Sequence, residues 1–241
     1  MGTFGCPFYY PKINMSEEFP DVKTMKIFLD SSDVGEITKA VDTGLIDGVT
    51  TNPTLMLQSG LNPKDVLSDI STLFGWDASI SAEVSGDSVS ELLEMADEYV
   101  QINPNITIKV PCTVDGLKVC NDLSADDIQV NVTLVFSVAQ AILSAKAGAS
   151  FVSPFVGRVD DNSFDGVELV GDIVKTFKTH GVDTQVLAAS LRNVKDVSEC
   201  FKRGSHVVTM PPKIFWKMYD HVLTEQGLKK FNEDWAKVMA L

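Results

Sequence analysis

Short apolar runs rich in β-branched residues alternate along this chain with longer segments in which apolar residues recur at helical spacing. The first pattern is typical of buried strands and the second of amphipathic helices. The predicted strands are residues 26–30, 48–51, 80–84, 106–110, 129–135, 151–155, 185–190 and 206–210. Helical spacing is clearest in residues 33–43, 88–100, 137–147, 165–179 and 193–202.

Eight strands that alternate with helices predict the α/β class and, within it, a (β/α)8 or TIM barrel rather than a doubly wound sheet. A doubly wound sheet would also need a glycine-rich phosphate-binding turn after its first strand, and FLDSSD at residues 28–33 is not one. Residues 214–223 and 227–239 also have helical spacing and follow the eighth strand. We therefore expect an extra C-terminal helix beyond the barrel that packs on another surface.

The first 24 residues contain three prolines and no sustained periodicity. The sequence therefore predicts an N-terminal extension over residues 1–24 and one barrel domain with its C-terminal helix over residues 25–241.

Composition narrows the class of protein. Apolar residues make up 44% and charged residues 22% of the 241 residues, which is enough to bury a sizeable core. The net charge of −13 disfavours binding to nucleic acid or to anionic membranes. We expect a cytoplasmic protein, because we find neither an apolar run long enough to span a bilayer nor a secretion signal.

The cysteines and histidines have no spacing that indicates a metal site or a disulfide framework. Cys6, Cys112, Cys120 and Cys200 are scattered, with no C-x-x-C pair. We therefore expect reduced thiols and no metal.

Polar residues inside the predicted strands are the clearest functional signal, because strands of a closed parallel barrel are buried on both faces. Side chains alternate along a strand, so Lys109 is expected to face the barrel axis together with Thr107. The same alternation pairs Ser81 with Glu83, Asn131 with Thr133, Ser153 with Phe155, and Ser190 with Arg192. Seven polar residues lie at or near the C-terminal ends of seven strands, where such barrels carry their active sites: Asp30, Asn52, Glu83, Lys109, Thr133, Ser153 and Ser190.

Lys109 has two interpretations. It can be a structural residue, either on a strand that is in fact at the surface or as half of a buried ion pair with Asp30 or Glu83 as its counter-ion. Alternatively it is a nucleophile, because burial disfavours the charged form of an amine and the neutral amine attacks a carbonyl to form a Schiff base. Asp30 and Glu83 would then transfer protons, and Thr133 would hold a water between them. The two roles are compatible.

Arginine is scarce, and two of the three arginines directly follow strand ends, in SPFVGR (Arg158) and ASLRN (Arg192). This placement favours an anion clamp, because guanidinium groups bind phosphate bidentately and such barrels often bind phosphate beside their last strands. The alternative is an ion pair at the rim with Asp160 or Asp161.

Together these motifs resemble the transaldolases, specifically the short subfamily that also contains fructose-6-phosphate aldolase. The matching segments follow the family's order and approximate spacing: KIFLDSSD, GVTTNPTL, ISAEV, ITIKVPCTVDGLK, NVTLVFS, SPFVGRVDD and AASLRN.

The resemblance implies a role for each matching residue. Lys109 would be the Schiff-base lysine and Asp30 the general acid/base, while Glu83 and Thr133 would position the catalytic water. Contacts to substrate hydroxyls would come from Asn52, Asn131 and Ser153, and contacts to the phosphate from Ser190, Arg192 and Arg158. The aldolase branch carries Gln in place of Glu83 and Tyr in place of Phe155, so this sequence follows the transaldolase branch at both positions.

The resemblance also implies the reaction. Transaldolases move a dihydroxyacetone unit from fructose 6-phosphate or sedoheptulose 7-phosphate to erythrose 4-phosphate or glyceraldehyde 3-phosphate, in the non-oxidative pentose phosphate pathway. They need no cofactor. The alternative is an aldolase that releases free dihydroxyacetone. Members of the short subfamily form rings in which the C-terminal helix reaches over a neighbouring subunit, so we expect a homo-oligomer, possibly a decamer.

Overall fold

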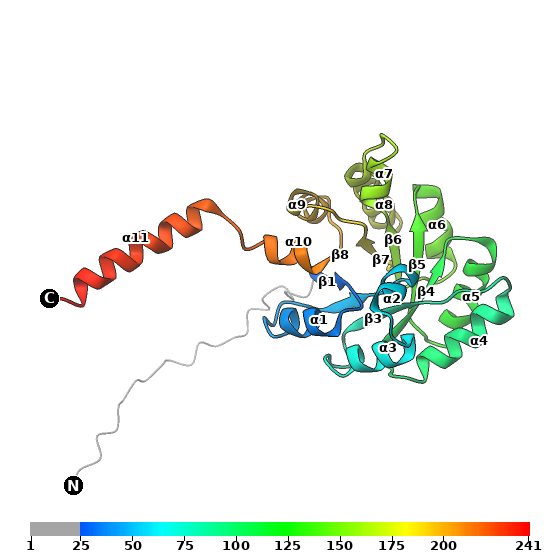
Figure 1. The fold of residues 1–241 in the computed structure, drawn as a ribbon. Helices are drawn as coiled ribbons and strands as arrows, with labels where there is room; N and C mark the ends of the chain where they lie inside the picture. The colour runs from blue at the N-terminus through cyan, green and yellow to red at the C-terminus, as the bar shows by residue number, and fades with distance from the viewer. Residues whose placement is uncertain (1–24) are drawn as a thin grey trace, which may run out of the picture.

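The computed structural model describes residues 25–241 (Figure 1). The expected N-terminal extension and Cys6 lie outside the described residues. Eight parallel strands close into a barrel in chain order: β1 (Lys26–Asp30), β2 (Gly48–Thr50), β3 (Ser79–Glu83), β4 (Ile106–Pro111), β5 (Val130–Val135), β6 (Phe151–Pro154), β7 (Gln185–Ala188) and β8 (Val207–Met210). The predicted (β/α)8 barrel is confirmed.

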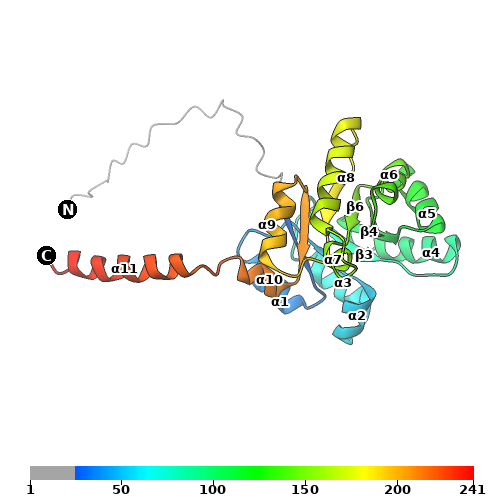
Figure 2. The ribbon, with the colours of Figure 1, turned by 90° about the horizontal axis from the view of Figure 1, so that it is seen from above.

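Helices surround this barrel, as Figures 1 and 2 show from two directions. They are α1 (Val34–Val41), α2 (Pro53–Ser59), α3 (Pro63–Ser71), α4 (Val89–Val100), α5 (Val114–Ala125), α6 (Val138–Lys146), α7 (Val156–Asp160), α8 (Gly166–His180), α9 (Val194–Lys202) and α10 (Pro212–Lys217). The last helix, α11 (Val222–Val238), extends away from the barrel. Two connections contain an additional short helix: α2 follows β2 and α7 follows β6. Both short helices therefore begin at the C-terminal end of a strand.

Most helices begin at a residue whose side chain accepts a hydrogen bond from a first-turn amide. These capping residues are Asp33, Asn52, Asn62, Ser88, Thr113, Ser137, Asp165, Asn193 and His221. The capping side chains therefore fix the first residues of these helices.

The two faces of the strands are packed differently. The outward face carries aliphatic side chains, such as Leu29, Ile80 and Ile108, which pack in the main apolar core beneath the helices. Inside the barrel, a smaller apolar cluster lies on β1, β6, β7 and β8, where the rings of Phe28 and Phe151 meet edge to face with centroids 6.2 Å apart. The interior beside β3, β4 and β5 is polar instead.

The C-terminal segment differs from its prediction. Residues 214–223 were predicted as one helical segment, but α10 ends at Lys217 and α11 begins only at Val222. Buried Ile214 and Phe215 fix α10 to the barrel, whereas α11 has no buried residue and projects away from it (Figure 2). Within residues 25–241, no helix is long and apolar enough to cross a membrane.

Candidate active site

Lys109 lies on β4 with its side chain 6% exposed, and its amine has two polar partners. Nζ lies 2.9 Å from Oε2 of Glu83 and donates to the carbonyl oxygen of Thr51 at 3.1 Å. The β3–β4 register pairs Glu83 with Lys109 directly, so the neighbouring strands bring the two charges together. The ion pair considered from the sequence is therefore present.

The amine of Lys109 also lines a cavity of about 120 Å³ at the C-terminal ends of the strands. The cavity is lined by Asp30, Thr50, Asn52, Lys109, Ser153, Phe155, Arg158, Ala189, Ser190 and Thr209. Seven of the eleven residues singled out from the sequence are in this lining. A purely structural ion pair needs no access from solvent, whereas a nucleophile does, so the geometry is compatible with both roles of Lys109.

Asp30 lies at the end of β1, with its carboxyl facing this cavity and otherwise enclosed by protein. Thr50 donates a hydrogen bond to Oδ1 of Asp30 at 2.8 Å, and the Asn52 side chain also bonds to this carboxyl. Burial raises the pKa of Asp30 above the usual aspartate value, while the charge of Lys109 and these hydrogen bonds oppose the rise. A carboxyl that holds its proton more readily is suited to general acid/base chemistry.

A chain of hydrogen bonds crosses the polar side of the barrel interior. Asn131 donates to Oγ of Ser81 at 3.1 Å, and Ser153 donates to Oδ1 of Asn131 at 2.7 Å. Asn131 itself does not line the cavity and contacts it only through Ser153. Thr133 is fully buried, and its hydroxyl has no hydrogen-bond partner among the described residues.

Phe155 and Arg158 form one wall of the cavity at the end of β6. The guanidinium of Arg158 lies 5.0 Å from the centre of the Phe155 ring, and Phe136 packs edge to face on the same ring at 5.8 Å. Cation–π and aromatic contacts of this kind restrict both side chains.

Arg192 does not line the cavity, although alternation along the strand predicted that it would point the same way as Ser190. β7 ends at Ala188, and Ser190 has a left-handed backbone with φ of 59°. Strand alternation does not continue through such a residue. Ser190 therefore reaches the cavity, while Arg192 forms an ion pair with Asp161 at the rim, one of the alternatives considered from the sequence.

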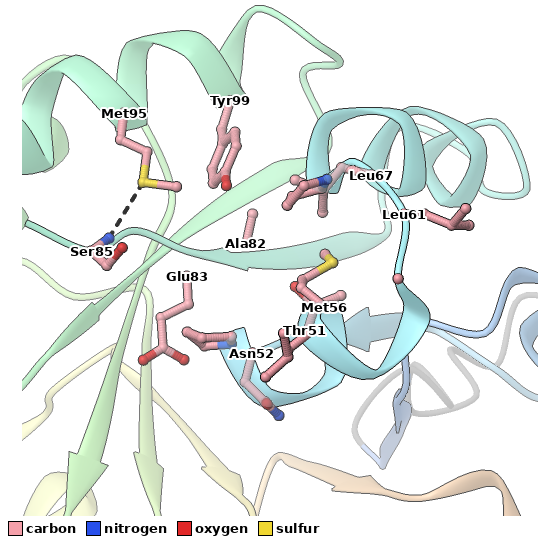
Figure 3. A pocket seen from close by; sticks show the side chains of 14 residues that line it. Thr51, Asn52, Met56, Leu61, Leu67, Ala82, Glu83, Ser85, Met95 and Tyr99 are labelled. Carbon is pink, nitrogen blue, oxygen red and sulfur yellow. Dashed lines mark hydrogen bonds between the residues drawn. The ribbon is translucent and has the colours of Figure 1, made fainter.

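A second cavity of about 460 Å³ lies beside the first, between β3 and helices α2, α3 and α4 (Figure 3). Asn52 lines both cavities, and Glu83 lies in this second lining although it pairs with Lys109. Met95 and Tyr99 extend into it from α4, as Figure 3 shows. Glu83 and Asp30 therefore line different cavities, although both lie near Lys109.

Three cavity residues were not identified from the sequence: apolar Ala189 and the polar residues Thr50 and Thr209. Thr50 and Thr209 share a hydrogen bond of 2.7 Å, and both lie next to Asp30 in the cavity lining. Each is a polar residue inside a predicted strand, in GVTT and HVVTM, so the signal used for the other residues would also have identified them.

No metal-binding arrangement of His, Cys, Asp and Glu occurs within the part of the chain that the structure describes. Cys112, Cys120 and Cys200 are free thiols, and burial raises the pKa of Cys120 and of Cys200 to about 12. The two thiols remain protonated at neutral pH.

Comparisons with known proteins match most of the chain. A family model described as "Transaldolase/Fructose-6-phosphate aldolase" matches residues 27–241. A protein of Paracoccus denitrificans named "Probable transaldolase" is 46% identical over 213 residues, which cover 88% of this chain and 97% of that protein. A protein of Clostridium kluyveri with the same name is 47% identical over 214 residues, 89% of this chain and 99% of its own.

Proposed function

The chain belongs to the transaldolase/fructose-6-phosphate aldolase family, and on that premise we propose that it is a class I transaldolase acting through a Schiff base on Lys109. The proposed donors are fructose 6-phosphate and sedoheptulose 7-phosphate, and the acceptors are erythrose 4-phosphate and glyceraldehyde 3-phosphate. This reaction belongs to the non-oxidative pentose phosphate pathway, and we propose the cytoplasm as its compartment.

The main support for this proposal is the position of Lys109. Lys109 lines a cavity together with Asp30, its amine lies 2.9 Å from a carboxylate oxygen of Glu83, and its charge also acts on the carboxyl of Asp30. Glu83, at 2.9 Å, accepts a proton from the ammonium, and the neutral amine then attacks the ketone carbon of the sugar. Loss of water from the carbinolamine gives a protonated imine that withdraws electrons from the adjacent carbon–carbon bond.

Asp30 is placed for the next step. It takes the proton from the substrate hydroxyl as the carbon–carbon bond breaks, so the aldehyde product leaves and a three-carbon enamine remains on Lys109. The carbonyl carbon of the acceptor aldehyde then bonds to the nucleophilic carbon of the enamine. Asp30 returns its proton to the alkoxide that forms. Thr133 and Glu83 would hold the water that hydrolyses the product imine. Every step uses side chains alone, so we propose no cofactor.

Borohydride trapping tests the proposal. Wild-type protein incubated with fructose 6-phosphate and borohydride is expected to gain the mass of one reduced three-carbon unit or one reduced sugar, and peptide mapping should locate it on Lys109. An adduct on exposed Lys118 or on Lys146, or no adduct, would contradict the proposal.

Fructose-6-phosphate aldolase activity is the second candidate, because the matching family model covers both activities. The two activities differ in what reaches the enamine first, an acceptor aldehyde or a proton. Glu83 bonds to Lys109, and Phe155 lines the same small cavity as Lys109 without offering a hydroxyl group. We infer that these two side chains favour transfer, because neither offers a proton-donating amide or phenol to a water beside the enamine.

The Glu83→Gln/Phe155→Tyr double variant is expected to form the enamine more slowly, because glutamine cannot accept the proton of Lys109. Of the enamine that forms, a larger share should be released as free dihydroxyacetone and a smaller share transferred to erythrose 4-phosphate. The measurement is product partitioning from fructose 6-phosphate, with and without acceptor. Phe136→Tyr is a matched control, because Phe136 contacts Phe155 but does not line the small cavity. A product ratio equal to that of the wild type would mean that neither side chain controls the fate of the enamine.

We propose that Ser190, Arg192 and Arg158 bind the substrate phosphate. Arg158 and Ser190 line the cavity, and Arg192 lies at its rim on the loop that follows Ser190. Arg192→Ala is expected to raise KM for fructose 6-phosphate by roughly 10- to 100-fold, the range for loss of a hydrogen bond between charged groups. KM for unphosphorylated fructose should change little. Equal losses for both sugars would assign Arg192 a role other than phosphate binding.

The exposed apolar residues of α11 support the proposal of a ring-shaped homo-oligomer. Leu228, Phe231 and Trp235 are each more than half exposed on a helix that has no buried residue. Exposed apolar surface of this extent is typical of interfaces. Deletion of residues 222–241 is expected to reduce the mass measured by sedimentation to that of a smaller species. A full-length protein that sediments as a monomer would contradict the proposal.

A further inference from the structure

Asp161 binds Arg192, which follows the cavity residue Ser190 by two positions. Both terminal nitrogens of the Arg192 guanidinium donate to the two carboxylate oxygens of Asp161. Each side chain is 52% exposed, so the pair is in contact with solvent. Asp161 follows α7 and caps it through its backbone amide alone, so its side chain is not needed to end the helix.

Gly157 lets Arg192 reach Asp161. A β-carbon at Gly157 would lie 2.7 Å from Nε of Arg192 and 2.5 Å from the carbonyl oxygen of Ser190. The arginine side chain therefore lies along α7 in the space that the glycine leaves free. The amide of Gly157 also donates to the Ser190 carbonyl at 3.1 Å, which fixes α7 against the loop that carries Arg192.

The carboxylate of Asp161 affects both arginines of the proposed phosphate site. The hydrogen bonds from Arg192 hold the pKa of Asp161 below its usual value, and the charge of Arg158 acts in the same direction. Asp161 is therefore ionised at neutral pH, and the three side chains together carry a charge of +1 rather than the +2 of the arginines alone.

We propose that Asp161 sets the affinity and phosphate selectivity of the site by competing with the substrate phosphate for the guanidinium of Arg192. This inference rests on the proposed function. A phosphate that binds the end of the Arg192 guanidinium needs the two terminal N–H groups that donate hydrogen bonds to Asp161. The phosphate and the Asp161 carboxylate therefore cannot both bind this end of the guanidinium. An ion pair this exposed is weak, so a phosphate dianion can displace the carboxylate.

The isosteric Asp161→Asn variant removes the competing charge and leaves the backbone cap intact. It is expected to bind inorganic phosphate and fructose 6-phosphate roughly two- to fivefold more tightly than the wild type, the factor to which a half-exposed ion pair corresponds. Affinity for unphosphorylated fructose should be unchanged. Calorimetric titration measures all three, without relying on turnover.

Two further variants test whether a change in phosphate affinity comes from competition for Arg192. Asp122→Asn removes the same charge from an exposed position on α5, away from the site, and should not change phosphate affinity. In an Arg192→Ala background, Asp161→Asn should lose its effect, because the competition needs the guanidinium.

The outcomes separate this inference from the proposed function. Weaker or unchanged phosphate binding by Asp161→Asn would overturn the inference, and so would an equal gain in the Arg192→Ala background. If either result is obtained while fructose 6-phosphate and borohydride still give an adduct on Lys109, the inference fails and the proposed function is retained. Tighter phosphate binding without any adduct would support the competition and overturn the Schiff-base chemistry instead.

Discussion

Replacing Lys109 by methionine is expected to lower kcat by roughly four orders of magnitude or more, because it removes the only lysine among the described residues that line the small cavity. The same variant should gain no mass from fructose 6-phosphate and borohydride. Methionine approximately conserves the volume of the lysine stem, so the strands around position 109 should keep their packing.

The stability of Lys109→Met is measured as well, because the substitution removes the ion-pair partner of Glu83. Methionine leaves the carboxylate of Glu83, which is 16% exposed, without its cation, and a buried charge without a partner is unfavourable. The Lys109→Met/Glu83→Gln variant removes both charges and should recover most of the lost stability while remaining inactive. Lys118→Met, on the exposed surface of α5, is the control and should form the adduct normally. An adduct in either Lys109 variant would show that another amine is the nucleophile.

The barrel could be predicted because its strands are short, β-branched and separated by clear helical periods. Eight such runs in alternation leave few other arrangements. Side-chain alternation on β4 also placed Lys109 correctly inside the barrel, since that strand is regular from Ile106 to Pro111. The hydrogen bonds between Ser81, Asn131 and Ser153 follow from the same regularity on three strands.

The rim of the site could not be predicted in this way. The helix α7 spans only Val156–Asp160, which is too short to produce a detectable period. The left-handed backbone at Ser190 is set by tertiary contacts, including the hydrogen bond from Gly157 to its carbonyl. The position of Arg192 depends on both features. Alternation therefore holds along the regular strand β4. It fails inside β5 at Leu134, where φ is 57° and the register with β6 shifts, and beyond the strand ends, where the loops contact each other.

Asp30→Asn is expected to lower kcat by roughly 10²- to 10⁴-fold, the usual contribution of a general acid/base. An amide of the same shape can keep the hydrogen bond from Thr50 but cannot exchange a proton with the substrate. Because Lys109 and Glu83 remain, the variant should still form the borohydride adduct with fructose 6-phosphate. Asp33→Asn, at the exposed cap of α1 nearby, keeps an N-cap side chain and should retain activity. Loss of the adduct in Asp30→Asn would assign Asp30 to imine formation rather than to bond cleavage.

Asp30→Asn is expected to stabilise the fold although it lowers kcat. The size of this stabilisation depends on pH. Burial raises the pKa of Asp30, so the folded protein keeps this proton to a higher pH than the unfolded chain does. The proton stabilises the fold below the ordinary aspartate pKa, and this contribution is lost as pH rises through the raised value. Asparagine cannot ionise, so Asp30→Asn should melt at a higher temperature than the wild type at pH 8, and the difference should shrink towards pH 4. A variant that melts below the wild type at pH 8 would mean that the attraction between Asp30 and Lys109 outweighs the cost of burial. A gain in stability with a loss of turnover would instead indicate that the fold maintains an ionisable carboxyl at this position for catalysis.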